Sequence, residues 1–255
     1  AFHWAARIFG TRAGLLVAAL VGTWFELVYF GSKPTVDALG AYFFVGALFL
    51  GRPAAGTRSR LAAGLCLALA AGIRLQLGPA VAAAALLIWL TAGARRGAAF
   101  AAGMAAGLIV VGLEEWAWWG APFRGHWRYV MMELRYHVSG GWGVMPATYF
   151  LKNGVLIYGG ALPVLIALAA LGARRAPLLL FAAVAVLLPF HLVGHKEYRF
   201  VIDAMPLLVL LVGLGVADIF GRVAPAYPSR AVGVLGRSEE HRLNSSHVSE
   251  SRMPS

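Results

Sequence analysis

Four side chains that could act on a charged substrate stand close together in the segment His195-Lys196-Glu197-Tyr198-Arg199-Phe200, between two long apolar stretches. We call this segment the hexapeptide. Arg199 presents a planar fork that suits phosphate oxygens, and Lys196 supplies a second fixed positive charge. Glu197 would balance or orient one of these cations. The pattern predicts a substrate-binding site, and the alternative is an interfacial turn closed by an ion pair between Glu197 and Arg199.

Three other ionisable residues stand inside or beside apolar stretches. Arg74 precedes Gly78-Pro79 and is a second candidate for the site, although snorkelling of a helix-end arginine to the interface explains it equally well. Glu26 lies within an apolar run, where an ionised carboxylate is costly, so we expect it to face the bundle interior or a wet cavity. Asp203 is expected in the first turn of the last helix, where the helix dipole favours an acid.

The elements that must position these residues are apolar helices. Hydrophobic residues make up 60% of the chain, only 13% are charged, and the mean hydropathy is +0.73, which predicts an integral membrane protein. Since about 20 apolar residues cross the hydrocarbon core, we expect an all-α polytopic fold of about eight transmembrane helices. Their expected ranges are 13–30, 36–50, 61–77, 79–92, 98–113, 155–171, 177–193 and 201–220.

The distribution of charge predicts an orientation. Loops with arginine and no acid, such as the one that contains Arg95 and Arg96, are typical of the cytoplasmic side. The alternate loops mix acids with bases and are rich in aromatic residues. We therefore expect residues 114–152 to form an outward-facing loop in a multi-pass protein of the bacterial inner membrane, with the site facing the periplasm or exterior. The tryptophans of this loop suit an interfacial belt or stacking on sugar rings.

Several other classes of function and site are excluded or not indicated. The basic residues do not gather on one face with interleaved aromatics, so a nucleic-acid partner is not expected. The sequence has no P-loop and no zinc motif, so we expect no cofactor, and it gives no support for a divalent metal. Residues 223–255 are expected to be disordered, and the composition of 236–255 resembles read-through of sequencing-adapter text. We give that stretch no functional weight.

The hexapeptide resembles the His-Lys-Glu-x-Arg-Phe signature of the Alg9-like mannosyltransferases, family 22 of the glycosyltransferases, which includes the third GPI mannosyltransferase. Lys33-Pro34-Thr35-Val36-Asp37 is similar to an outward Arg-Thr-Leu-x-Asn segment of that family. The stretch from Glu115 to Phe123 resembles its Asp-x-x-x-x-Gly-x-x-x-Pro region, with Glu115 in place of Asp. The pair Tyr149-Phe150 matches the Tyr-Phe that precedes the next span.

This resemblance implies a GT-C fold and the transfer of mannose, or a related hexose, from a polyprenyl-phosphate donor to a lipid or glycan acceptor outside the membrane. The bilayer is then a further partner. The substrate-binding residues would be His195, Lys196, Glu197, Arg199, Arg74, Glu115 and Lys33. Related enzymes place the catalytic carboxylate in the first outward loop, so we expect the base upstream of Ala1, in a bacterial-type chain that is truncated here and inactive alone.

Two other classes of function remain open from the sequence. A secondary transporter or lipid flippase would use Glu26 and Arg74 as coupling or substrate residues. That class is usually marked by internal repeats and by charges near the midplane in both halves, whereas this sequence shows no convincing repeat and gathers its charges on one side. A non-catalytic membrane scaffold explains the spans but gives the hexapeptide no role.

Overall fold

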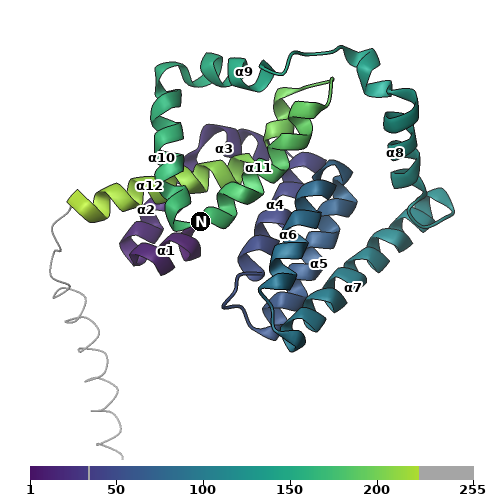
Figure 1. Ribbon diagram of the computed structural model, residues 1–255, viewed down its shortest axis with the longest axis horizontal. Coiled ribbons are helices and arrows are strands. Elements are labelled where there is room, and N and C mark those ends of the chain that lie inside the picture. The colour runs from purple at the N-terminus through teal and green to yellow at the C-terminus, as the bar shows by residue number, and fades with distance from the viewer. Residues whose placement is uncertain (34, 224–255) are drawn as a thin grey trace, which may run out of the picture. The chain divides into compact units, whose positions relative to one another are not determined.

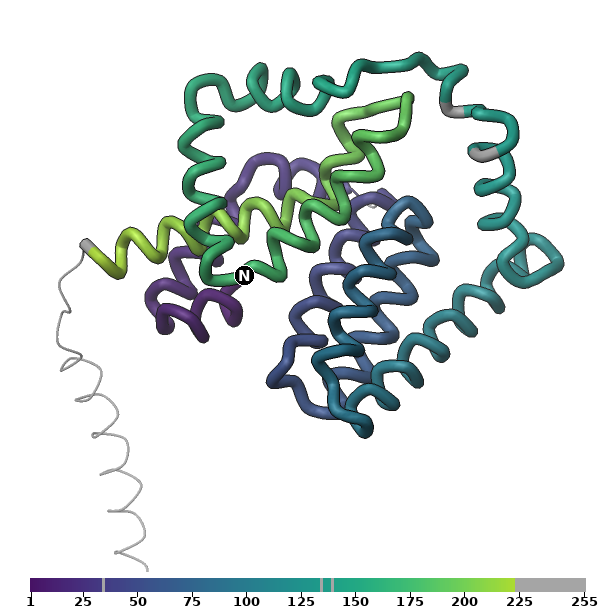
Figure 2. Tube along the Cα trace, in the orientation of Figure 1, coloured from purple at the N-terminus to yellow at the C-terminus, as the bar shows by residue number. Residues whose placement is uncertain are grey.

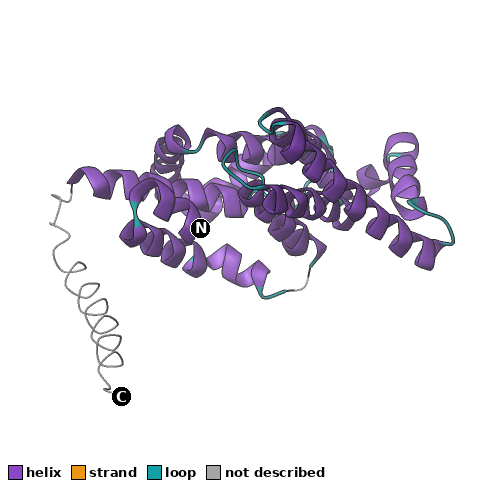
Figure 3. Cartoon of the chain, turned by 90° about the horizontal axis from the view of Figure 1, so that it is seen from below, coloured by secondary structure: helices purple, strands orange, loops and turns teal. Residues whose placement is uncertain are grey.

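The computed structural model describes residues 1–33 and 35–223, and within these ranges every regular element is a helix (Figure 3). The α-helices run in the order α1 (Phe2–Phe9), α2 (Thr11–Thr23), α3 (Phe25–Gly31), α4 (Val36–Leu50), α5 (Thr57–Ile73), α6 (Gly78–Leu90), α7 (Ala94–Trp119), α8 (Arg124–Tyr136), α9 (Tyr149–Tyr158), α10 (Leu162–Arg175), α11 (Pro177–Leu192) and α12 (Met205–Val223) (Figure 1). Short 3-10 segments are η1 (Leu75–Leu77), η2 (Val138–Trp142), η3 (Gly159–Ala161) and η4 (Tyr198–Val201).

The expected membrane helices are present as helices, but the prediction of about eight spans is not confirmed. Among the described residues, three helical stretches are long and apolar enough to cross a bilayer: Ala94–Trp119, Tyr149–Arg175 and Met205–Arg222. The pair α2 and α3 raises the number to four if it is counted as one bent span. The others are too short, since the 15 residues of α4 extend only about 22 Å against a hydrocarbon core of about 30 Å.

The first predicted span is broken at Trp24. The two helices on either side, α2 and α3, meet at an angle of 60°, because Trp24 adopts an extended backbone between them. The Trp24 indole Nε1 donates to the Glu26 carboxylate over 2.8 Å, and Thr23 Oγ1 donates to the Ala19 carbonyl over 2.8 Å. Side-chain hydrogen bonds thus accompany the break, and Glu26 lies in the first turn of α3.

Glycines allow two helix pairs to approach closely. In the tube trace (Figure 2), α5 runs beside α4 and α7. A methyl group added at Gly103 of α7 would collide with the Leu61 carbonyl of α5, and one added at Gly64 would collide with the Phe100 carbonyl. Gly172 of α10 and Gly215 of α12 make an equivalent close contact with the opposite backbone. This is the packing expected of small residues in membrane helices.

Large apolar side chains remain exposed along the long helices. Leu108, Ile109 and Val110 on α7 and Leu156 on α9 are examples, and the apolar window of Tyr149–Arg175 has none of its residues buried. An apolar surface of this extent is unfavourable in water and matches hydrocarbon. The chain is therefore an integral membrane protein.

The segment predicted as an outward loop, 114–152, contains substantial helix. The helix α7 continues to Trp119 and ends where Gly120 adopts a left-handed backbone with φ 73°. The helix α8 and the 3-10 segment η2 follow, and α9 begins at Tyr149. The predicted disordered tail 223–255, with the read-through stretch 236–255, lies outside the described residues apart from Val223, which ends α12.

Candidate functional site

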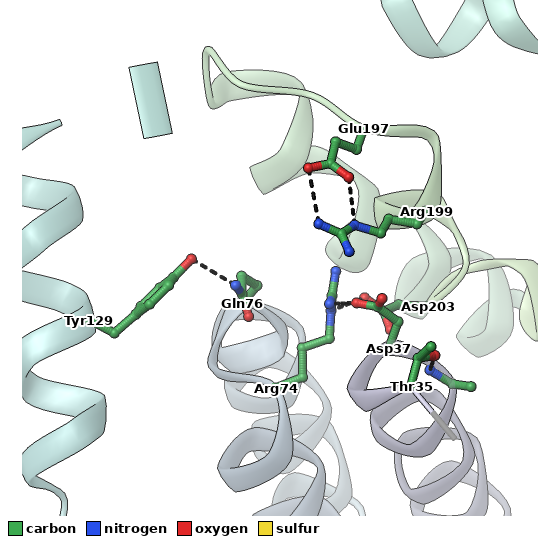
Figure 4. Close-up of polar contacts among 9 residues, drawn as sticks. Thr35, Asp37, Arg74, Gln76, Tyr129, Glu197, Arg199 and Asp203 are labelled. Atoms are coloured by element: carbon green, nitrogen blue, oxygen red, sulfur yellow. Dashed lines mark hydrogen bonds and ion pairs between the residues drawn. The ribbon is translucent and has the colours of Figure 1, made fainter. Parts of the chain in front are cut away.

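A cavity of about 650 Å³ forms where the start of α4, the end of α5, the face of α8 and the hexapeptide meet. Figure 4 shows the guanidinium group of Arg74 just below the Glu197–Arg199 pair, with Gln76 and Tyr129 to one side. The polar and charged side chains that line the cavity are Asp37, Arg74, Gln76, Tyr129, Glu133, His195, Glu197 and Arg199. Its apolar surface comes from Val36, Pro79, Trp142, Pro189, Phe190, Val193 and Phe200.

Arg74 lies at the bottom of this site and is held between two acids. It follows the last turn of α5 in an extended conformation, with φ −139° and ψ 93°, which turns its side chain away from the helix axis. Its Nη1 pairs with Asp37, and its Nε lies 2.5 Å from Asp203 Oδ2. The side chain of Arg74 is only 4% exposed, so it does not snorkel to the interface.

The burial of this cluster changes the acidity of its members. Burial raises the pKa of Asp203 to about 7, although the charge of Arg74 opposes that shift. Burial also lowers the pKa of Arg74, and Asp203 opposes this shift in turn. Asp203 lies just before α12, not in its first turn as the sequence suggested. Arg74 Nη2 is buried and has no hydrogen-bond partner among the described residues, so this cation retains a donor for a ligand.

Four hexapeptide side chains line the cavity: His195, Glu197, Arg199 and Phe200. Arg199 and Glu197 form a two-point pair, with Nε to Oε2 at 2.6 Å and Nη2 donating to Oε1 over 3.0 Å. His195 Nε2 also lies 3.0 Å from Glu197 Oε1. The pKa of Glu197 is lowered, chiefly by the His195 hydrogen bond and then by Arg199. The ion pair proposed as the alternative interpretation is therefore present, but it lines the cavity.

Lys196 points away from the cavity. Its Nζ donates to the Val193 carbonyl over 2.5 Å and to the Met145 carbonyl over 3.3 Å, and the residue is buried. The Met145 N–H donates in turn to the Gly194 carbonyl over 2.9 Å. The predicted donor-binding lysine thus ties the hexapeptide to the segment before α9.

Two other predicted site residues also lie outside the cavity lining. Glu115 is buried near the end of α7, where its Oε2 accepts from the Gly125 N–H over 2.5 Å and its Oε1 lies 3.1 Å from His126 Nδ1. It therefore fixes the first turn of α8. Lys33, after α3, lies 3.8 Å above the centre of the Tyr29 ring. Of the seven predicted residues, Arg74, His195, Glu197 and Arg199 line the cavity.

Sequence reasoning missed the wall of the cavity that α8 forms. Tyr129 and Glu133 stand four residues apart, which places them on one helix face, and both line the cavity. Gln76 Nε2 donates to the Tyr129 hydroxyl over 2.7 Å, and burial raises the pKa of Tyr129. The four-residue spacing was a usable signal, but it has meaning only once 124–136 is taken as a helix and not as a loop.

The two walls of the cavity differ in chemistry. One carries the guanidinium groups of Arg74 and Arg199, which suit an anionic group, together with their carboxylate partners Asp37 and Glu197. The other carries an amide, a phenol and a carboxylate, from Gln76, Tyr129 and Glu133, which can exchange hydrogen bonds with hydroxyl groups. Across the part of the chain that the structure describes, no three His, Cys, Asp or Glu side chains are grouped so that they could hold a metal ion.

The family model described as the Alg9-like mannosyltransferase family matches residues 1–251. The comparisons with curated proteins and with solved structures gave no match.

Proposed function

This chain belongs to the Alg9-like mannosyltransferase family, and on that premise we propose that its cavity binds a mannose donor carried on polyprenyl phosphate. The family is one of glycosyltransferases, so the chain is a membrane glycosyltransferase and not a transporter or a scaffold. We further propose a GT-C architecture in the bacterial inner membrane, with the cavity open to the outer face. The acceptor would be a lipid-linked or envelope glycan.

The observation that carries this proposal is the meeting of Arg74 and Arg199 at one cavity. These residues are 125 positions apart in the sequence, yet both line the same 650 Å³ space. Arg74 is fixed by two buried acids and keeps Nη2 available. Paired guanidinium groups bind phosphate oxygens in a defined geometry, so this wall suits the phosphate of the donor.

The opposite wall suits the sugar. Gln76, Tyr129 and Glu133 offer donors and acceptors to ring hydroxyls, and Trp142 adds an aromatic surface at the rim. A mannosyl phosphate placed between the two walls would direct its anionic end toward Arg74 and Arg199. Its hydroxyls would then lie toward α8, which makes α8 the candidate for selection of the hexose.

The proposed chemistry follows from this placement. An acceptor hydroxyl attacks the anomeric carbon with inversion while a carboxylate takes up the hydroxyl proton. The bond between the anomeric carbon and the phosphate oxygen breaks, and polyprenyl phosphate leaves with the electron pair. Negative charge grows on the phosphate during this step, so fixed cations stabilise the transition state more than the ground state.

Donor binding by the protein in lipid nanodiscs tests the proposal. We expect Arg199→Met to weaken binding of polyprenyl-phosphate mannose by roughly 10-fold to 100-fold, because a charged hydrogen bond contributes about 1.5–3 kcal/mol. Arg58→Met is the matched control, since Arg58 is exposed at the start of α5 and does not line the cavity. If Arg199→Met binds the donor as tightly as the wild type, the assignment of the phosphate to this wall is wrong.

A second measurement separates donor recognition from binding of any lipid phosphate. The Arg199→Met variant should bind polyprenyl phosphate without sugar more weakly than the wild type does, whereas the Glu133→Gln variant should bind it as tightly as the wild type. Polyprenyl-phosphate mannose should be sensitive to both substitutions. Equal sensitivity of the two ligands to Glu133→Gln would show that α8 does not contact the sugar.

A further inference from the structure

Glu26 is a buried carboxylate that collects hydrogen bonds from three parts of the chain. Its residue is 2% exposed. Oε2 accepts from Trp24 Nε1 over 2.8 Å and from the hydroxyl of Tyr158, and Oε1 accepts from the hydroxyl of Tyr198. Trp24 stands at the break between α2 and α3, Tyr158 ends α9, and Tyr198 belongs to the hexapeptide. One side chain therefore joins three segments.

These hydrogen bonds fix the positions of the three donors. An ionised carboxylate within an apolar helix pair is expensive unless its oxygens are satisfied. Both oxygens of Glu26 are occupied, and hydrogen bonds to a charged acceptor are about twice as strong as neutral ones. Moving any donor away would leave part of the charge unsatisfied in a region of low polarity, so the cluster opposes displacement of each segment that it joins.

Tyr198 connects this cluster to the cavity. It is the residue between Glu197 and Arg199, and its side chain points to the other side of the chain from theirs. Glu197 and Arg199 line the 650 Å³ cavity, whereas Tyr198 lines a second cavity of about 730 Å³ together with Glu26. The backbone tightens into η4 at this residue, so Tyr198 and Arg199 belong to the same short turn.

We infer that Glu26 is a positioning residue that holds Arg199 at the donor cavity through the Tyr198 hydroxyl. The inference rests on the proposed function only in assigning Arg199 to the donor phosphate. Glu26 itself does not line the cavity of Arg199, and its two oxygens already accept hydrogen bonds. Its role is therefore to constrain the hexapeptide, and not to contact the substrate.

The structure offers a matched pair of substitutions. Tyr198→Phe and Tyr158→Phe each remove one hydroxyl from the same carboxylate and keep the aromatic ring. Only Tyr198 belongs to the hexapeptide, since Tyr158 lies at the end of α9. A purely structural role for the cluster predicts the same consequences for the two variants, whereas positioning through Tyr198 predicts different ones.

Two measurements on the protein in nanodiscs then distinguish positioning through Tyr198 from a purely structural role of the cluster. Hydrogen exchange should rise at least 10-fold across residues 195–200 in Tyr198→Phe and stay within about 3-fold of the wild type there in Tyr158→Phe. Affinity for polyprenyl-phosphate mannose should fall about 10-fold in Tyr198→Phe only. Equal effects of the two substitutions on exchange and on affinity would overturn the inference.

The two readouts also separate this inference from the proposed function. If the wild type does not bind the donor, the proposed function fails, while the exchange difference still reports whether Tyr198 fixes the hexapeptide. If the wild type binds the donor and the exchange of residues 195–200 is the same in both variants, the positioning role fails and the proposed function stands.

Discussion

Removing the charge of Arg74 should destabilise the protein strongly, because two buried acids depend on this cation. The substitution Arg74→Met keeps an unbranched apolar stem and removes the guanidinium. The side chains of Asp37 and Asp203 are 8% and 0% exposed, so neither carboxylate can regain full hydration when the cation is lost. The variant therefore contains two unpaired acids in a buried site.

The expected cost follows from this burial and depends on pH. Breaking a buried ion pair by removing one partner costs about 3–5 kcal/mol. Asp203 already has its pKa raised to about 7, so it can become neutral at modest cost in acid. We expect a loss of about 3 kcal/mol at pH 6 and about 5 kcal/mol at pH 8, which corresponds to a lowering of the unfolding midpoint by roughly 10 °C.

Thermal unfolding in detergent at the two pH values measures this effect. Arg199→Met is the control, because its partner Glu197 is 37% exposed and Arg199 is 56% exposed, and an exposed pair contributes about 1 kcal/mol or less. The double variant Arg74→Met/Asp203→Asn should recover about 1–3 kcal/mol. A double variant no more stable than Arg74→Met, or an equal loss in Arg199→Met, would refute the argument.

Three further predictions concern stability. The folded pKa of Asp203 is raised from 3.8 to about 7, so the stability that its protonated form contributes is complete below about pH 4 and disappears as pH rises through 7. The free energy of unfolding of the wild type should therefore fall by up to about 4 kcal/mol over that range. Asp203→Asn should reduce the slope of unfolding free energy against pH. Lys196→Met should cost about 1–3 kcal/mol in denaturant unfolding, because two carbonyls lose a charged donor, and an unchanged midpoint would contradict the anchoring role. Gly103→Ala should lower the free energy of unfolding by more than about 2 kcal/mol, because it forces α5 and α7 apart. Gly46→Ala on α4 is the control: an added methyl group there meets no atom within 4 Å, so the change should be neutral or slightly stabilising. Similar losses of stability in both glycine variants would show that close packing is not the cause.

Apolar runs in the sequence predict where helices form more reliably than they predict how many cross the membrane. The range 36–50 coincides with α4, and the last predicted span overlaps α12. The break at Trp24 was missed because the apolar run continues through it, and the hydrogen bonds that reach Glu26 just beyond it come from the distant residues Tyr158 and Tyr198. Local propensity contains no information about such distant donors.

The residues of the candidate site likewise divide into those that the sequence could identify and those that it could not. Arg74 and Arg199 could be selected from their types and their place at the ends of apolar runs, and the structure brings both to one cavity. Lys196 could not be distinguished from its neighbours, since the direction of its side chain depends on the carbonyls of Val193 and Met145. Glu133 could be selected as a site residue only with the knowledge that α8 is a helix and that the face it shares with Tyr129 turns toward η1.

The alternation of side chains along the hexapeptide separates two kinds of mutational sensitivity. Lys196 and Tyr198 are hydrogen-bonded to the surrounding protein, whereas His195, Glu197 and Arg199 face the cavity. Changes at Lys196 should reduce the amount of folded protein, changes at Tyr198 should loosen the hexapeptide, and changes at the second set should alter ligand binding directly. A combinatorial library restricted to positions 195, 197 and 199 could therefore vary the charges proposed to meet the donor phosphate on a constant framework, while the hexose contacts proposed for α8 stay unchanged.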